Sequence, residues 1–382
     1  MAKSMDRIIE SARGIQLDQA DHDHVEAFVD KIAAKHPTVN TGALFDVAES
    51  TTKYYKAVAE SGAGMVQDDV DLFRDISMIV TAKFFTGSVI AELASVQPLD
   101  NIYGYIYRMT FEYGDDYANN GITAGQSLAA VRSSSFASDP GEQVPARKLK
   151  AELRRELVEA KLRPLELSST FQSLLRRASV LGRDRAAFDN RMLQTAYTKL
   201  RDELEVTTLA QIQAIVPANN KVDYTDPLTG SANLPSEKEV EYGMFFDALA
   251  EASLRVYNST GLYPNVAIVG DKGLRLIERH IKQPFQTMNN PVNMMPQRGR
   301  LGIFGQRWAI YYDPTMTNKV VLGVFNPDDP NSNPIIYAPY ITLAVSPEIL
   351  DRDLSTAQVV FSVDRVDISE PAFFAMVTIL AS

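Results

Sequence analysis

The sequence predicts an α+β protein in which helices come first and strands dominate the C-terminal part. Apolar residues recur at helical spacing over much of residues 8–94, and again from Thr170 to Val216. Residues 103–113 instead carry a tyrosine, methionine or phenylalanine at every second position, which predicts a strand. Residues 114–145 show neither pattern and are rich in Gly, Ser, Ala, Asn and Asp. A structureless stretch of that length is unusual in a compact domain, so it predicts a loop with a function of its own.

The remaining elements follow from the same two periodicities. An apolar helix at about 68–94 ends before Gln97-Pro98, because proline disfavours the helical conformation in the residue before it. The pattern over 170–216 has a break at Gly182 and stops at Pro217. Beyond the polar loop at 219–235 we expect a helix at Glu237–Tyr257 and strands at Asn265–Gly270, Trp308–Tyr312, Lys319–Phe325, Val359–Ile368 and Phe373–Leu380.

A basic segment follows the irregular stretch. Between Val144 and Arg163, seven basic residues stand against three acidic ones, although the whole chain has a net charge of -10. Helix propensity favours a helix here, but Val158, Ala160 and Leu162 alternate and Pro164 suits an edge strand, so both structures stay open. The basic residues are Arg147, Lys148, Lys150, Arg154, Arg155, Lys161 and Arg163.

Composition narrows the class of function. An apolar share of 45% allows a sizeable core, and 23% charged residues do not indicate disorder. The acidic net charge argues against a dedicated nucleic-acid binder, which normally carries a basic surface. The chain has no cysteine, which excludes disulfides, thiolate nucleophiles and cysteine-bound metals. Residues 1–16 do not have the pattern of a signal peptide, and no apolar run approaches membrane-spanning length, so we expect a soluble protein made in the cytoplasm.

No motif predicts catalysis. The best metal candidate is Asp21-His22-Asp23-His24, but the two imidazoles would project apart on a helix, and a solvated helix cap is the favoured interpretation. Gly270-Asp271-Lys272-Gly273 follows a strand and precedes a helix, as anion sites do, but lacks the rest of a phosphate-binding fingerprint. Gly302 and Gly305, and the acidic pairs at 115–116 and 328–329, also lack the context of a site. We therefore expect no enzyme, no catalytic residue, no cofactor and no metal.

Several stretches, taken in order, resemble the major capsid proteins of T-even-like tailed bacteriophages. The most specific is Ile336–Leu343, which is close to the family's YAPYVAL run. The others resemble a VQPM-type turn, the returning strand of an extended loop, a strand–turn–helix, and a glycine-containing turn before a strand, at 95–99, 159–163, 261–277 and 302–313. Their shared order extends the resemblance over about residues 70–382.

The resemblance implies the HK97 fold, which has an N-terminal arm, an extended E-loop, a P-domain with a long spine helix, and an A-domain at the centre of each capsomer. Mapped onto this sequence, it implies a helical arm at 1–69, an E-loop at 105–168 and an A-domain at 218–350. The P-domain would combine 70–104, 169–217 and 351–382, with the spine helix at about 184–216.

The resemblance also implies a function. A major capsid protein self-assembles into hexamers and pentamers, which form the icosahedral head shell of the virion around double-stranded DNA without reading its sequence. Its partners would be other copies of itself and the portal, vertex or decoration proteins of the same capsid, and assembly would take place in the host cytoplasm. An encapsulin-like nanocompartment, which encloses enzyme cargo, is the alternative. An enzyme that uses residues 21–24 or 270–273 is a third hypothesis.

Two groups of residues are candidate contacts between subunits. The first is the basic group Arg147, Lys148, Lys150, Arg154 and Arg155, which we expect to lie across an acidic patch of an adjacent subunit. The second is Tyr54 and Tyr55, whose surface would be buried if the arm wraps a neighbour.

Overall fold

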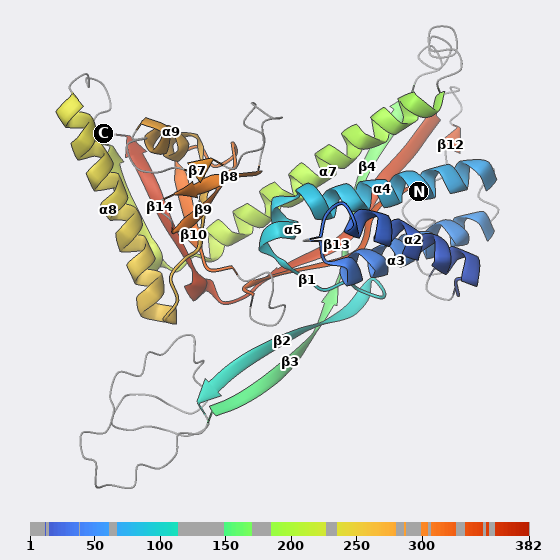
Figure 1. Cartoon of the computed structure of the whole chain (residues 1–382), viewed down its shortest axis with the longest axis horizontal. Coiled ribbons are helices and arrows are strands. Elements are labelled where there is room, and N and C mark those ends of the chain that lie inside the picture. Colours follow the sequence, from blue (N-terminus) through green and yellow to red (C-terminus); the bar gives the residue numbers. More distant parts are fainter. Residues whose placement is uncertain are drawn as a thin grey trace.

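Two sheets organise the chain, and a two-stranded ribbon projects from one of them (Figure 1). The structure is a computed structural model. It describes residues 12, 15–37, 39–60, 67–113, 149–169, 185–226, 235–279, 286–287, 299–304, 307–325, 333–346, 349–350 and 356–381.

The first sheet has five strands, in the order β1-β11-β13-β12, with β4 on the other side of β13. These strands are β1 (Ser95–Val96), β4 (Lys161–Ser169), β11 (Ile335–Val345), β12 (Ile349–Leu350) and β13 (Thr356–Ile368). Five helices pack around it: α2 (Gln19–Ala33), α3 (Thr41–Glu60), α4 (Gln67–Gly87), α5 (Val89–Leu93) and the long α7 (Arg185–Ile215). We call this sheet and these helices the body.

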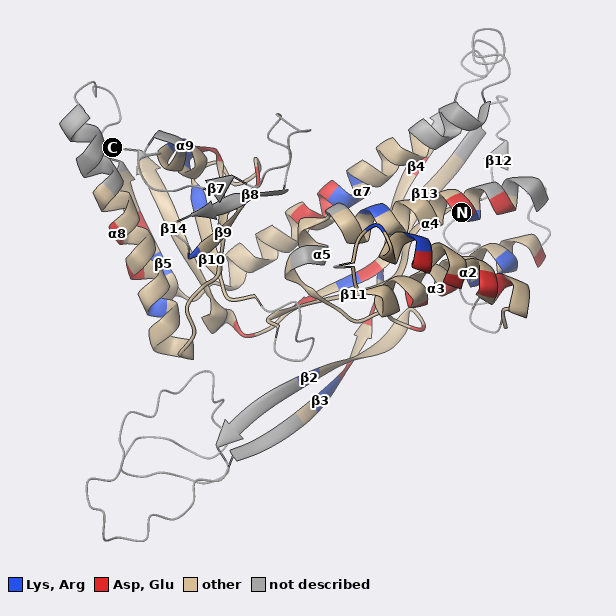
Figure 2. Cartoon of the chain, viewed as in Figure 1, with Lys and Arg blue, Asp and Glu red and all other residues tan. Residues whose placement is uncertain are grey.

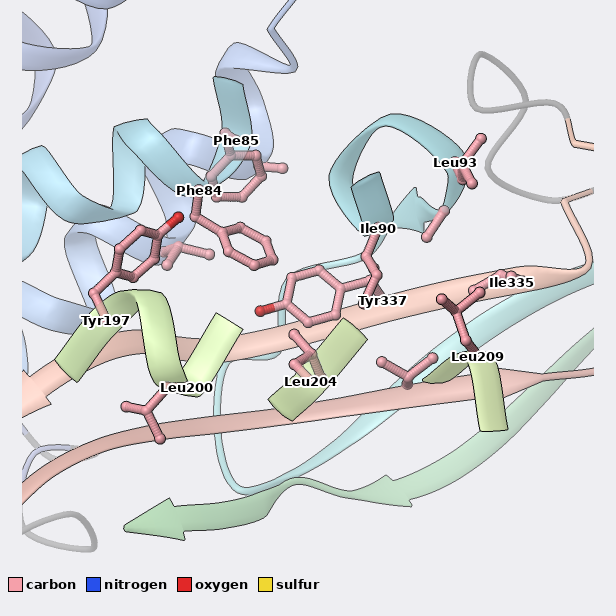
Figure 3. Close-up of a cluster of buried hydrophobic side chains, with 14 of the residues drawn as sticks. Phe84, Phe85, Ile90, Leu93, Tyr197, Leu200, Leu204, Leu209, Ile335 and Tyr337 are labelled. Atoms are coloured by element: carbon pink, nitrogen blue, oxygen red, sulfur yellow. The ribbon is translucent and has the colours of Figure 1, made fainter. Parts of the chain in front are cut away.

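Every residue of β11 is buried, because both faces of the strand are covered. On one face, Tyr337 and Leu343 share a core with side chains of α4 and α7. Figure 3 shows that core, with Phe84 of α4 and Tyr197 and Leu204 of α7 around the Tyr337 ring. On the other face, Ile336, Tyr340 and their neighbours pack in a second cluster with α3.

The second sheet has seven strands, in the order β5-β14-β10-β6-β9-β8-β7. The strands are β5 (Lys221–Asp226), β6 (Val266–Val269), β7 (Gln286–Thr287), β8 (Gly299–Phe304), β9 (Trp308–Tyr312), β10 (Lys319–Gly323) and β14 (Phe374–Ala381). The helices α8 (Pro235–Thr260) and α9 (Asp271–Arg279) pack against it over a core that includes Trp308. We call this part the α/β lobe. Two short 3-10 turns complete the described elements, η2 (Ala218–Asn220) and η3 (Pro371–Phe373).

The expected domain boundaries need two corrections. Residues 335–345 were assigned to the A-domain range 218–350, but as β11 they pair with β13 in the body. Residues 374–381 were assigned to the P-domain range, but as β14 they pair with β5 and β10 in the α/β lobe. The chain therefore passes between the two sheets at α7–β5, at β10–β11 and at β13–β14. Sequence patterns show that a segment is a strand, but they do not show which sheet supplies its partners.

The helix expected over 68–94 is divided at Ser88, where α4 ends and α5 begins. Ser88 makes no side-chain cap for α5. Instead Glu205 of α7, which is buried, accepts hydrogen bonds from the Val89 N–H (3.2 Å) and from the Ser88 hydroxyl (3.0 Å). A carboxylate near a helix N-terminus also interacts favourably with the helix dipole, so α7 supplies the cap that the local sequence lacks.

The first helices are part of the body. Helix α3 packs on α2, α4 and β11, and both Tyr54 and Tyr55 are 1% exposed. The Tyr54 hydroxyl donates to the Val345 carbonyl at 3.4 Å, and the Tyr55 hydroxyl accepts from the Val345 N–H at 3.1 Å and contacts Ser77. The expectation that these tyrosines contact a neighbouring subunit is therefore wrong, because the chain's own strand β11 covers them.

Tyr55→Phe is expected to destabilise the subunit by about 1–3 kcal/mol, because the buried Val345 N–H then loses its acceptor. Tyr54→Phe is the matched control: its bond to the Val345 carbonyl is longer, so it should cost less than about 1 kcal/mol. Urea unfolding of the two variants measures the difference, and equal losses would contradict this role of Tyr55.

Candidate functional site

The most prominent surface feature is an antiparallel ribbon of two strands, β2 (Tyr103–Tyr113) and β3 (Leu149–Glu159). The strands pair continuously from Tyr103 opposite Glu159 to Tyr113 opposite Leu149. Figure 1 shows the ribbon leaving the body and extending away from it. The described part of the basic segment is thus extended, and Pro164 lies in β4, whose one described partner strand is β13.

One face of the ribbon is apolar and exposed. Alternation along the two strands puts five large side chains on this face, each between 43% and 62% exposed: Tyr103, Tyr105, Tyr107, Leu153 and Leu157. The Arg155 guanidinium lies 3.3 Å from the centroid of the Tyr105 ring on the same face. Aromatic and arginine side chains are enriched in protein–protein interfaces, so this face has the composition of a contact surface.

The other face is buried where the ribbon joins the body. There Ile106 and Val158 pack with Leu99 and with Ile336 of β11 in the second core cluster. Gly104 lies directly against Leu99, so a side chain at this position would overlap it. Farther from the body on this face, Arg154 of β3 lies directly opposite Arg108 of β2. Arg154 and Arg155 therefore point to opposite faces of the ribbon.

Two ion pairs connect the root of the ribbon to β13. Arg163 of β4, the strand that continues from β3, donates from Nε to Asp364 Oδ1 at 3.0 Å. Arg108 of β2 pairs with Asp367. The Gln97 side chain adds two hydrogen bonds to the Tyr107 backbone, both 2.9 Å long.

Asp364 is the most deeply buried of these acids. Its side chain is 1% exposed, and burial raises the pKa of its carboxyl group, while Arg163 opposes that rise. Arg163 therefore offsets part of the cost of burying this carboxyl group inside the body. Sequence reasoning missed Arg108, Asp364 and Asp367. The available signal was an acidic residue within the apolar run of β13, VVFSVDRVDI.

Of the five basic residues predicted to contact a neighbour, the structure describes the side chains of two. Arg154 and Arg155 are exposed on the ribbon. Lys150 lies in β3, but the placement of its side chain is outside the described part, and Arg147 and Lys148 lie wholly outside the described residues. Figure 2 shows acidic residues on α2, and of these Asp23, Glu26 and Asp30 are exposed at the surface of the body.

The metal and anion candidates form no site where they are described. Residues 21–24 lie in the first turns of α2, after the cap residue Asp18, and Asp21 binds Lys56 at 2.9 Å. Within the described ranges, no three His, Asp or Glu side chains are placed to hold a metal ion. At Gly270 a Cβ would overlap the carbonyl oxygen of Met316, so close backbone packing explains this glycine. Gly302 lies in β8, and Gly305 is outside the described residues. Of the helices described, none combines the length and the apolar character that a membrane span requires.

Known proteins are similar to this chain in structure but not detectably in sequence. No model of a known protein family matches the chain, and no curated protein matches its sequence. Many solved structures are similar to it, and phage capsid structures recur among them. The mature capsid of bacteriophage PhiM1 is 13% identical, with 76% of this chain and 87% of that chain covered and a TM-score of 0.43. A Gordonia phage Cozz structure is 13% identical, with 78% and 87% covered and a TM-score of 0.46. An encapsulin from Synechococcus elongatus is 8% identical, with 76% and 86% covered and a TM-score of 0.41. All three TM-scores are below 0.5.

Proposed function

We propose that the chain is a shell-forming subunit, and specifically the major capsid protein of a tailed phage. The observation that carries this proposal is the ribbon: a folded body extends two paired strands into solvent and leaves a tyrosine–leucine face uncovered. An isolated two-stranded ribbon is marginally stable in water, so its exposed apolar face favours a partner. In a closed shell that partner is another copy of the same chain.

The sequence resemblance assigns a role in a capsid to the ribbon, to α7, to the body and to the α/β lobe. In this proposal the ribbon is the E-loop, α7 is the spine helix, the body is the P-domain, and the α/β lobe is the A-domain that surrounds the capsomer centre. Hexamers and pentamers of the chain would form an icosahedral head shell in the host cytoplasm, and in the virion this shell would enclose double-stranded DNA. Portal, vertex and decoration proteins would be its further partners.

Electron microscopy of the expressed full-length chain tests the class. We expect closed icosahedral shells, whereas a chain that stays monomeric at high concentration would overturn the proposal. The contents of particles from the native source separate the two kinds of shell: packaged DNA supports the capsid, and an enclosed enzyme supports the encapsulin-like alternative.

Charge reversal on the ribbon, Arg154→Glu with Arg155→Glu, is expected to abolish shell formation and leave the subunit folded. The two side chains are exposed and belong to no core cluster, so the subunit should stay folded, but like charges brought together across an interface cost several kcal/mol. Lys83→Glu with Lys199→Glu on α4 and α7 is the control, because it changes the net charge equally on two exposed residues of the body, away from the ribbon and from the α/β lobe. Electron microscopy measures shell formation, and circular dichroism measures whether the subunit is folded. Normal shells from the ribbon variant would rule out the proposed contact.

A further inference from the structure

The ribbon is held by carboxylates on both faces of one strand. Asp364 and Asp367 are three residues apart on β13, so their side chains point to opposite faces of the sheet. Asp364 binds Arg163, which lies in the strand that continues from the ribbon's returning strand. Asp367 binds Arg108, which lies in its outgoing strand. Each of the two chain segments at the root is therefore fixed to β13 from a different side.

These pairs are shielded from water. The four side chains are between 1% and 18% exposed, and charged hydrogen bonds in such surroundings are stronger than the same bonds on a surface. Gln97 adds a third fixed point, since its amide both donates to and accepts from the Tyr107 backbone, as a neighbouring strand would. Gln97 is itself fixed, because its N–H donates to the Tyr337 carbonyl of β11 at 2.9 Å.

A small change in the angle of the ribbon at its root would displace the far end of the ribbon by a large distance. The five residue steps from Arg108 to Tyr113 span about 17 Å at the usual strand rise, so a rotation of about 20° at the root moves Tyr113 by about 6 Å. That displacement exceeds the spacing of neighbouring strands, and the contact face would meet different residues of a partner. Identical subunits in a closed assembly repeat the same kinds of contact, so the ribbon has to present its face within a narrow range of angles.

We propose that Arg108–Asp367 and Arg163–Asp364 are positioning pairs, which fix the angle between ribbon and body and thereby make the shells uniform in size. This inference rests on the proposed function, because it assigns a purpose to the ribbon within a shell. We call the two pairs together with Gln97 the root clamp.

The test compares shells from clamp variants with wild-type shells. Asp367→Asn removes the charge from the less buried of the two pairs. The double variant Arg163→Met with Asp364→Leu replaces the more buried pair by apolar side chains that keep the region packed. Glu251→Gln, which breaks an exposed pair with Arg255 on α8, is the control. Electron microscopy gives the distribution of diameters, and hydrogen exchange reports on the root through the Tyr107 and Ala160 amides.

For the clamp variants we expect the single wild-type diameter to be lost, with mixed or open particles in its place. Exchange at Tyr107 and Ala160 should be about tenfold faster or more, because local opening at the root becomes easier. The swapped pair Arg108→Asp with Asp367→Arg should restore both properties in part. The control should match the wild type.

The outcomes separate the two ideas. If the wild type forms no shells, the proposed function fails and the clamp has no purpose to serve. If the wild type forms uniform shells, and the folded clamp variants form shells of the same diameter with unchanged exchange, the clamp is overturned and the shell function stands.

Discussion

Asp364→Leu alone is expected to destabilise the subunit by about 3–5 kcal/mol, because it leaves the largely buried Arg163 without its counter-charge. The double variant Arg163→Met with Asp364→Leu should come close to the wild type, since a well-packed apolar pair of similar volume often replaces a buried ion pair at little cost. Urea unfolding of the wild type, both single variants and the double variant gives the coupling energy of the pair. Additive losses in this cycle would show that the two side chains do not depend on one another.

The same pair predicts a pH dependence. Burial raises the pKa of Asp364 above its ordinary value of 3.8, so the folded chain holds a proton on this carboxyl group more tightly than the unfolded chain does. The stability gained by protonation is complete below pH 3.8 and is lost as the pH rises through the raised pKa. On acidification through that interval, the unfolding free energy of the wild type should therefore rise relative to that of the double variant.

Gly270→Ala is expected to destabilise the α/β lobe by about 3 kcal/mol or more, because the new Cβ would overlap the Met316 carbonyl oxygen. That oxygen belongs to the backbone of the turn between β9 and β10, so the overlap is relieved only if one of two backbone segments moves. The Gly270 N–H also donates to the Lys319 carbonyl at 3.0 Å, and this bond ties the same two segments together.

Gly243→Ala is the matched control for Gly270→Ala. Gly243 lies within α8, and a Cβ there meets nothing within 4 Å. This substitution should stabilise the chain by about 0.5–1 kcal/mol through helix propensity alone. Thermal unfolding of the two variants should shift in opposite directions. A Gly270→Ala variant as stable as the wild type would contradict the packing seen at the β6–α9 turn.

The sequence predicted the elements better than their arrangement. Alternation at 103–113 locates β2, and the helical spacing that follows the break at Gly182 locates α7, since each periodicity reflects a long and regular local pattern. The expected domain ranges separated β11 and β14 from the strands with which they pair, because strand pairing depends on contacts between residues far apart in the chain. The break at Ser88 was missed for the same reason: its cause is Glu205, more than a hundred residues away.

In the ribbon, too, the sequence predicted local features but not contacts between distant residues. Composition alone singled out Arg154 and Arg155, and both are exposed on the ribbon. The pairs at the root are held by residues from separate strands, and the linear sequence gives no direct signal of which arginine meets which aspartate. Tyr54 and Tyr55 show the opposite error, because their partner proved to be Val345 of the same chain.

The order of the strands also has a consequence for synthesis. β13 pairs with β4, β11 and β12 in the body, and β14 stands between β5 and β10 in the α/β lobe. Both strands belong to residues 356–381, which leave the ribosome after all their partners have done so. A nascent chain can therefore complete neither described sheet until residues 356–381 have emerged, and pairings over such distances form slowly. Until those residues arrive, the edges of β5 and β11 that will pair with β14 and β13 stay open.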